Sequence, residues 1–456
     1  MPTVNLAPMA GAGAQFLTNA GAVLSGGLIY TYVAGGTTPA STYTTYTGGT
    51  AHTNPIVLDS YGRVPTGGEV WCDTSVTYKF VLKTSLGTTI GTYDNLVNAA
   101  ATASAALTAY TASVAASTGS SLVGYLSAAA NATATTVQAK LRTGPITPKD
   151  FGAVMDGSTD DATAWTAFAA ALAASPRPYG YIPPGTLVTS STPNFAIQNL
   201  TLEIASNARI KSTASGASSC GFKIDGTTNT GGDASGVYGI TILGRLTVQA
   251  DGADYGAFIK LCHHADLSID VTGALTAGHY HYANVCTTFR RCSMSSNEAA
   301  LTQAPTNLLY VTGGGSSQNA YCTYENMTME GGAVAVYFDY ALGNTILGGT
   351  IESNSSKGLY MTANALQNKF YGVDLESNTT NDIECLGRSN HFIGCDTNTL
   401  LTIGAGGGIN RIIGGNHKSI TLNATSYLNV VDKVAYNRTG SGGVLTDSGV
   451  VADNPN

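Results

Sequence analysis

A motif of asparagine, apolar residue and glycine recurs at nearly constant spacing in the second half of this 456-residue chain. Four asparagines each precede an apolar residue by two positions and a glycine by four: Asn344, Asn368, Asn390 and Asn410. They are 24, 22 and 20 residues apart. A period of about 22 residues with short apolar runs and glycine bends indicates a solenoid of β coils. We interpret it as a right-handed parallel β-helix, in which the asparagines form a structural ladder because stacked amides bond from coil to coil.

Looser copies of the repeat extend the predicted β-helix over residues 195–431. At about 22 residues per coil, this length accommodates about ten coils. Residues 144–194 form the predicted N-terminal cap, with a short helix at about 160–174 in which Trp165, Phe168 and Leu172 share one face. Residues 432–456 follow the last clear repeat as a C-terminal tail.

The fold expected for the whole chain is all-β, apart from short helical segments. Two further segments precede the cap. Residues 1–98 alternate β-prone runs with glycine turns, which predicts a small β module. Residues 99–143 form a neck rich in Ala, Thr and Ser. It carries apolar residues at helical spacing: Leu107, Tyr110, Val114, Leu122, Tyr125 and Leu126. Two interpretations stay open for the neck, a trimeric coiled coil and a flexible tether.

Short motifs within the first 185 residues resemble those of known proteins. Residues 149–153 (KDFGA) and 181–185 (YIPPG) resemble the opening of the pectate-lyase-like β-helix superfamily. Residues 121–126 (SLVGYL) are similar to the neck of the tailspikes and tail fibres of tailed bacteriophages. Residues 24–27 (LSGG) and 78–82 (YKFVL) look like the virion-attachment modules of the same proteins.

This resemblance implies a homotrimer that is fixed to other phage tail proteins through residues 1–98 and projects its β-helix toward a bacterial surface glycan. Such a protein is assembled in the host cytoplasm and resides in the virion. The first function it implies is a virion-anchored adhesin or structural tail protein. The alternative is a tail depolymerase that hydrolyses capsule or O-antigen polysaccharide, since many relatives cleave their glycan with paired carboxylates. The residues leave open whether the protein is an enzyme.

Charge and cysteine usage exclude other classes. The chain has 21 basic and 28 acidic residues and no Lys/Arg cluster of the kind that binds phosphate backbones, so we expect no nucleic-acid partner. No window of 18 apolar residues occurs, so we expect no membrane insertion. The eight cysteines show no metal-ligand spacing, which predicts buried free thiols, no metal and no cofactor.

A pair of carboxylates on adjacent coils is the candidate catalytic site. Glu352 and Glu376 lie 24 residues apart in matching tripeptides, Glu-Ser-Asn, and Asp374 shares a strand with Glu376. Glycoside hydrolases use two carboxyl groups, about 5 to 5.5 Å apart in retaining enzymes. The competing interpretation is that each Glu-Ser-Asn ends a strand and bonds to the backbone of a turn.

Aromatic and histidine side chains are further candidates. Tyr337, Tyr340 and Tyr360 could stack on sugar rings, although aromatic residues of a coil more often pack inside. His279 and His281 occur at the spacing that places both on one side of a strand. A third metal ligand at suitable spacing is missing, and we expect these histidines at the surface near loops.

Overall fold

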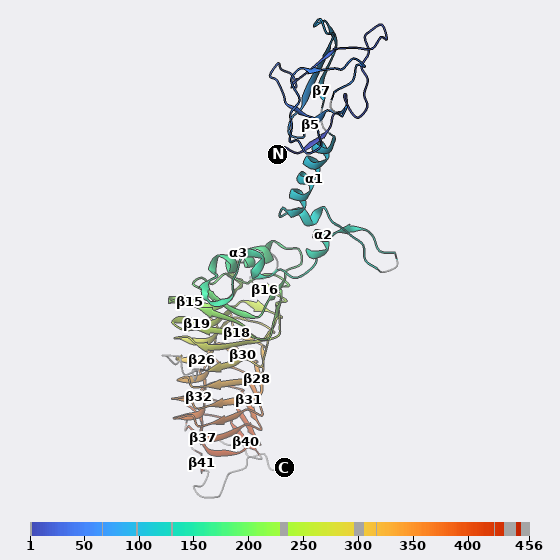
Figure 1. The fold of residues 1–456 in the computed structure, drawn as a ribbon. Coiled ribbons are helices and arrows are strands. Elements are labelled where there is room, and N and C mark those ends of the chain that lie inside the picture. The colour runs from blue at the N-terminus through green and yellow to red at the C-terminus, as the bar shows by residue number, and fades with distance from the viewer. Residues whose placement is uncertain are drawn as a thin grey trace. The chain divides into compact units, whose positions relative to one another are not determined.

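The computed structural model describes residues 2–65, 67–96, 99–128, 131–228, 236–295, 305–315, 317–423, 425–432 and 444–447. The chain divides into two units, Met1–Gly144 and Pro145–Asn456 (Figure 1). The first unit contains small antiparallel sheets and a helix, and the second is a parallel β-solenoid of about ten turns. The all-β architecture predicted from the repeat is therefore confirmed. No described helix is long and apolar enough to cross a membrane.

The first unit is built on two antiparallel sheets. One has the order β1-β5-β3 and the other β4-β2-β6-β7. Tyr78, Phe80 and Leu82 on β6 face the core and are buried, as the two-residue period requires. The strands are β1 (Val4–Leu6), β2 (Leu28–Val33), β3 (Thr42–Tyr43), β4 (Ile56–Val57), β5 (Trp71–Asp73), β6 (Tyr78–Lys83) and β7 (Thr89–Leu96).

The neck begins with one helix and does not stay helical. Helix α1 spans Ala99–Ala115, and Leu107 and Tyr110 on it are 66% and 60% exposed. A 3-10 turn, a short hairpin and a five-residue helix follow: η1 (Gly119–Ser121), β8 (Gly124–Tyr125), β9 (Thr135–Thr136) and α2 (Val137–Leu141). The expectation that Tyr125 continues the helical stripe is therefore wrong, because Tyr125 lies in strand β8 after two glycines, Gly119 and Gly124, that favour turns over helix.

Helix α3 (Ala162–Ala174) covers the first coil of the second unit. Trp165, Phe168 and Leu172 are buried on one side of it, as predicted. Trp165 packs against Phe168 and Phe195 with ring centroids 5.4 and 4.7 Å apart. The carboxylate of Asp160 accepts the N–H of Ala162 at 3.0 Å, which satisfies one of the unpaired donors at the helix start. The 3-10 turns of this unit are η2 (Pro148–Phe151) and η3 (Gly226–Thr228).

Three faces of stacked parallel strands make up the solenoid, and each coil passes through face 1, face 2 and face 3 in that order. Parallel pairing begins before residue 195, at β10 and β11. Face 1 consists of β11 (Tyr179–Ile182), β13 (Thr201–Ile204), β17 (Thr241–Leu243), β21 (Asp266–Leu267), β24 (Thr288–Arg290), the starts of β28 (Thr323–Glu330) and β31 (Thr345–Glu352), β33 (Lys369–Tyr371), β36 (His391–Ile393), β38 (Arg411–Ile413) and β40 (Val430–Asp432).

Face 2 consists of β10 (Asp156–Asp160), β12 (Gly185–Thr189), β14 (Ala208–Ser212), β18 (Leu246–Ala250), β22 (Ile269–Gly273), β25 (Ser293–Ser295), the ends of β28 and β31, β34 (Asp374–Glu376) and the start of β37 (Asp396–Ile403). Face 3 consists of β15 (Gly216–Asp225), β19 (Ala253–Lys260), β23 (Ala277–Tyr282), β26 (Asn307–Thr312), β29 (Val334–Phe338), β32 (Lys357–Met361), β35 (Asn381–Cys385), the end of β37, β39 (His417–Leu422) and β41 (Val444–Asp447).

Short strands between face 3 and face 1 are β16 (Val237–Tyr238), β20 (Cys262–His263), β27 (Asn319–Ala320) and β30 (Ala341–Leu342).

A continuous row of buried asparagines lies just before face 1. The side chain of each bonds to the next along the axis, from Asn319 through Asn344, Asn368, Asn390 and Asn410 to Asn429, with Nδ2–Oδ1 distances of 3.1 to 3.3 Å. Asn368 shows the arrangement: its Oδ1 accepts the N–H and Nδ2 of Asn344, and its Nδ2 donates to Ala341 and Asn390. The row satisfies donors that would otherwise be buried without partners.

All eight cysteines are free. Seven of them are buried, and Cys286 is exposed. The expectation of buried thiols is wrong for Cys286 because it sits at a bend with φ 50° after Val285, which directs its side chain outward.

Candidate functional site

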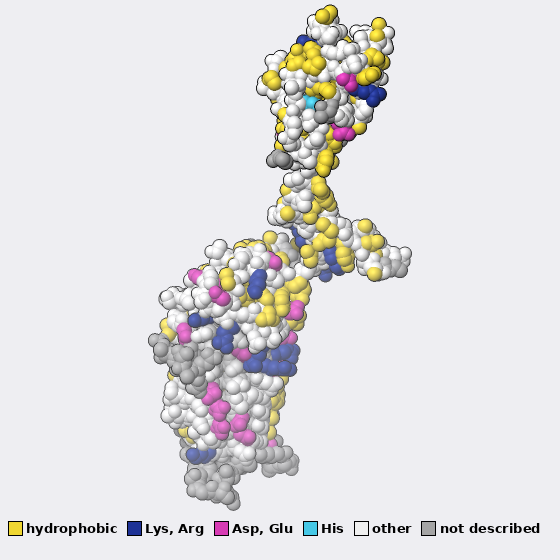
Figure 2. Space-filling model, in the orientation of Figure 1, with side chains coloured by type: hydrophobic (Ala, Val, Ile, Leu, Met, Phe, Trp, Pro, Cys, Tyr) yellow, Lys and Arg dark blue, Asp and Glu magenta, His cyan; other side chains and the backbone are white. Residues whose placement is uncertain are grey.

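Acidic side chains line the outer side of face 2 in the C-terminal half of the solenoid. The strand register pairs Glu330 with Glu352 and Glu352 with Glu376, so three glutamates stack on consecutive coils. Asp374 lies two residues before Glu376 on the same side of β34 and pairs with Asp396 on the next coil. We call these five residues the acidic column, and Figure 2 shows acidic side chains gathered on this half of the solenoid. The structure thus brings the three predicted carboxylates together.

Like charges one strand spacing apart, about 4.8 Å, repel each other. Desolvation, followed by the charges of Glu330 and Glu376, raises the pKa of Glu352 above its usual range. Desolvation and the charges of Glu376 and Asp396 raise the pKa of Asp374 in the same way. Within the described residues, no lysine or arginine forms an ion pair with Glu352, Asp374, Glu376 or Asp396. A carboxyl group with a raised pKa suits a general acid. The uncompensated negative charge of the stacked carboxylates also attracts a cation from outside the chain, which would lower these pKa values.

An aromatic column runs along the outer side of face 3. The register stacks Phe258, Tyr280, Tyr310, Tyr337 and Tyr360 on five consecutive coils. Neighbouring ring centroids lie 4.9 to 5.5 Å apart, and every ring is partly exposed. Such rings offer apolar surface and, in the tyrosines, hydroxyl groups. This combination can stack on a sugar ring and hydrogen-bond its hydroxyls.

The planes of the rings are not all parallel. Phe258 and Tyr280 are nearly parallel at 13°, whereas Tyr310 is turned by 81° from each of its neighbours, Tyr280 and Tyr337. A lysine lies at each end of the column: the Nζ of Lys223 is 5.9 Å from the ring centroid of Phe258, and that of Lys357 is 4.2 Å from the centroid of Tyr360. Lys357 also forms an ion pair with Glu384.

Of the three predicted glycan-binding tyrosines, two belong to the aromatic column and one does not. Tyr337 and Tyr360 are register partners with centroids 5.2 Å apart. Tyr340 lies in the turn after β29 with φ 47°, outside the column. The intervening Phe338 points inward and is fully buried, so only alternate aromatic residues of this strand reach the surface.

His279 and His281 lie inside the solenoid, so the expectation that they are surface residues is wrong. Both point inward on β23, where His279 Nδ1 is 3.3 Å from His281 Nε2 and His281 Nδ1 is 3.2 Å from the hydroxyl of Tyr324. Burial lowers the pKa of His279 to about 4 and that of His281 well below its usual value. The described residues include no group of His, Cys, Asp or Glu arranged to hold a metal ion.

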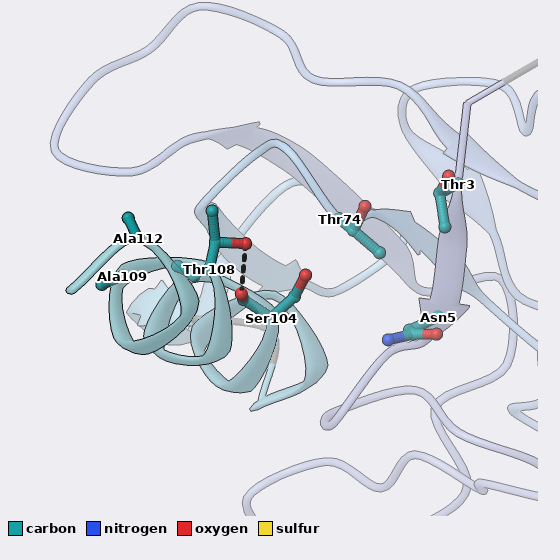
Figure 3. A pocket seen from close by; sticks show the side chains of 8 residues that line it. Thr3, Asn5, Thr74, Ser104, Thr108, Ala109 and Ala112 are labelled. Carbon is teal, nitrogen blue, oxygen red and sulfur yellow. Dashed lines mark hydrogen bonds between the residues drawn. The ribbon is translucent and has the colours of Figure 1, made fainter. Parts of the chain in front are cut away.

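The first unit has a groove of about 840 Å³ between helix α1 and strand β1 (Figure 3). Its lining side chains are small and carry mostly hydroxyl, amide or methyl groups: Thr3, Asn5, Thr74, Ser104, Ala105, Thr108, Ala109 and Ala112. Thr108 donates its hydroxyl proton to the carbonyl of Ser104, one helical turn earlier. The lining has no charged or catalytic side chain, so this groove offers no chemistry.

Sequence reasoning missed more than half of the aromatic column and two members of the acidic column. Tyr280, Tyr310 and Tyr337 are 30 and 27 residues apart because long connections interrupt the coils there. Glu330 and Asp396 lack the Glu-Ser-Asn context that identified Glu352. Strand alternation counted from the inward apolar residues would have found both sets.

The sequence matches no protein-family profile and no curated protein. Among solved structures, ORF18 of Geobacillus virus E2 is similar with a TM-score of 0.50 and 20% identity, over 69% of this chain and 60% of the viral protein. The tailspike of E. coli bacteriophage HK620 aligns with a TM-score of 0.47 and 13% identity, over 76% and 73%. The adhesin PfbA of Streptococcus pneumoniae aligns with a TM-score of 0.42 and 13% identity, over 63% and 85%.

The chain spans less than two thirds of the Geobacillus virus protein, and the similarity at this identity concerns the fold. The similarity therefore shows a shared fold, the parallel β-helix.

Proposed function

We propose that this protein is a virion-anchored tail adhesin that contacts a bacterial surface glycan through the aromatic column. The observation that carries the proposal is the row of partly exposed rings on five consecutive coils. Contiguous exposed apolar surface marks interaction sites, and tyrosines combine that surface with a polar tip. The column runs along the solenoid axis, so it fits an extended oligosaccharide better than a compact ligand.

Anchoring and assembly complete the proposal. The first unit folds around a core of its own and carries the segments that resemble virion-attachment modules, so we assign it to the contact with other tail proteins. Leu107 and Tyr110 on α1 are largely exposed in the single chain. Three parallel copies would bury this stripe in a coiled coil, which supports a homotrimer that resides in the phage tail.

The test measures retention of the full chain on a panel of purified bacterial capsular and O-antigen polysaccharides. Each aromatic contact contributes about 1 kcal/mol, so the double variant Tyr337→Ala/Tyr360→Ala should bind a retained glycan about 30-fold more weakly. Tyr337→Phe/Tyr360→Phe keeps both rings and should bind more tightly than the alanine variant. Tyr321→Ala removes an exposed tyrosine outside the column and serves as the control. Equal binding by the column variant and the control would overturn the assignment.

Hydrolysis of the glycan is the second candidate function, and the raised pKa values of Glu352 and Asp374 favour it. In this case a protonated Glu352 would donate to the leaving oxygen and Glu376 would act as nucleophile or base. New reducing ends should then appear when the protein is incubated with a polysaccharide that it retains. Glu352→Gln and Glu376→Gln should each abolish them while leaving retention unchanged. A retained polysaccharide that stays uncut excludes this function for that glycan.

A further inference from the structure

The outer side of face 1 carries the opposite charge to the acidic column. Lys369, His391 and Arg411 are register partners on three consecutive coils, and we call them the basic column. Within the described residues, none of the three forms an ion pair. Desolvation and the charges of Arg411 and Lys369 lower the pKa of His391. The positive charge of the basic column is therefore carried by Lys369 and Arg411, with His391 between them.

An apolar strip lies beside the basic column on the same face. Leu347, Tyr371, Ile393 and Ile413 are register partners on four consecutive coils and point outward. Leu347 and Tyr371 are each 37% exposed. Face 1 thus presents apolar surface flanked by unpaired positive charge, an arrangement typical of a protein interface rather than of a solvated sheet.

The two charged columns overlap on two coils. Lys369 on β33 is followed directly by Asp374 and Glu376 on β34, and His391 on β36 by Asp396 on β37. Copies of the chain that stand side by side with parallel axes bring equal coils to the same level. Lys369 of one copy is then level with Asp374 and Glu376 of the next, and His391 with Asp396.

We propose that, in the trimer, face 1 of each copy packs on face 2 of the next, with the basic column opposite the acidic column and the apolar strip buried. This inference rests on the homotrimer of the proposed function. A contact between two different faces repeats around a threefold axis and closes into a ring. Each copy uses its basic column once and its acidic column once, and the two columns face each other over the coils of Lys369 and His391.

The packing has two consequences for the surface. The carboxylates of the acidic column serve protomer contact, and they are covered rather than open to a polysaccharide. This packing and hydrolysis of the glycan by Glu352 and Glu376 therefore exclude each other. Face 3 takes no part in the contact, so the aromatic column stays on the outside of the trimer. The two faces that carry unbalanced charge are thereby buried, and the face that carries tyrosines is displayed.

Disulfide trapping in the full chain tests the contact. The variant Lys369→Cys/Glu376→Cys places one thiol in each column, on different faces of the same chain. After mild oxidation, denaturing gels without reductant should show covalent dimers and trimers that reductant removes. Each single variant is a control for contacts between identical positions. Lys369→Cys/Thr402→Cys is the matched control, because Thr402 lies on the outer side of face 3.

Light scattering of the unmodified chain separates the possible failures. If the chain is a trimer and the double-cysteine variant forms covalent dimers and trimers, the proposal is supported. If the chain is a trimer but this variant is cross-linked no more than the control variants, this contact alone is overturned. A monomer overturns both the contact and the trimer, while the retention assay on polysaccharides still tests glycan binding. Charge reversal covers the case in which the cysteine variant fails to fold. Lys369→Glu and Glu376→Lys should each weaken association by at least about tenfold, and the combined exchange should restore it.

Discussion

Replacing one member of the buried asparagine row should destabilise the second unit severely. In Asn368→Ala the side chain loses four hydrogen bonds of 3.0 to 3.1 Å, two to Asn344, one to Ala341 and one to Asn390. The backbone N–H of Asn344 is left without the acceptor it has in the structure. Each bond contributes about 1 kcal/mol net and a buried unsatisfied donor costs about 1–3 kcal/mol, so we expect a loss of about 5–7 kcal/mol.

Urea unfolding of the full chain, followed by the loss of β signal in circular dichroism, measures this free energy once reversibility is established. The control is Asn364→Ala, since Asn364 is exposed and donates one bond to Asp339 at 3.0 Å. It should lose less than about 1 kcal/mol. If Asn368→Ala costs no more than the control, the row of amides does not stabilise the coils and our account of the repeat fails.

Three further outcomes concern the burial of individual side chains. Lowering the pH from 7 to 5 should reduce the free energy of unfolding by about 2 kcal/mol through His279. The folded pKa of His279, about 4, lies below the unfolded value of 6.5, so only the unfolded chain gains the proton in this range. In urea titrations, His279→Asn should remove this contribution to the pH dependence. Trp165→Ala should cost about 3–5 kcal/mol, and a melting temperature equal to wild type would contradict its packing. A thiol reagent should label Cys286 alone in the folded protein and all eight cysteines in denaturant.

The period of the asparagine motif was sufficient to predict the solenoid, because each coil there uses the same short turn before face 1. It failed to include Asn319 and Asn429, which continue the same row. Asn319 is 25 residues from Asn344, but the residues around it lack the glycine four positions later. A motif search that relies on the turn glycine therefore stops where the turn changes, although the amide contact continues.

Side-chain direction was the part of the site that sequence spacing left undecided. Alternation places His279 and His281 on one side of a strand but does not say which side. That choice depends on the register with Ala257 and Ile259, whose inward direction is set by the coil before. The same register decides that Tyr337 points outward and Phe338 inward. Charge complementarity between faces 1 and 2 likewise depends on strand pairing.

The most direct test of the central claim is adhesion to bacterial cells whose surface polysaccharide has been destroyed selectively. Labelled full-length protein is incubated with a panel of bacterial strains, each untreated, oxidised with periodate or treated with protease. The account predicts that binding to a susceptible strain disappears after periodate and survives protease, and that Tyr337→Ala/Tyr360→Ala binds the untreated cells weakly. Binding that survives periodate and disappears after protease would show a protein receptor and would contradict the account.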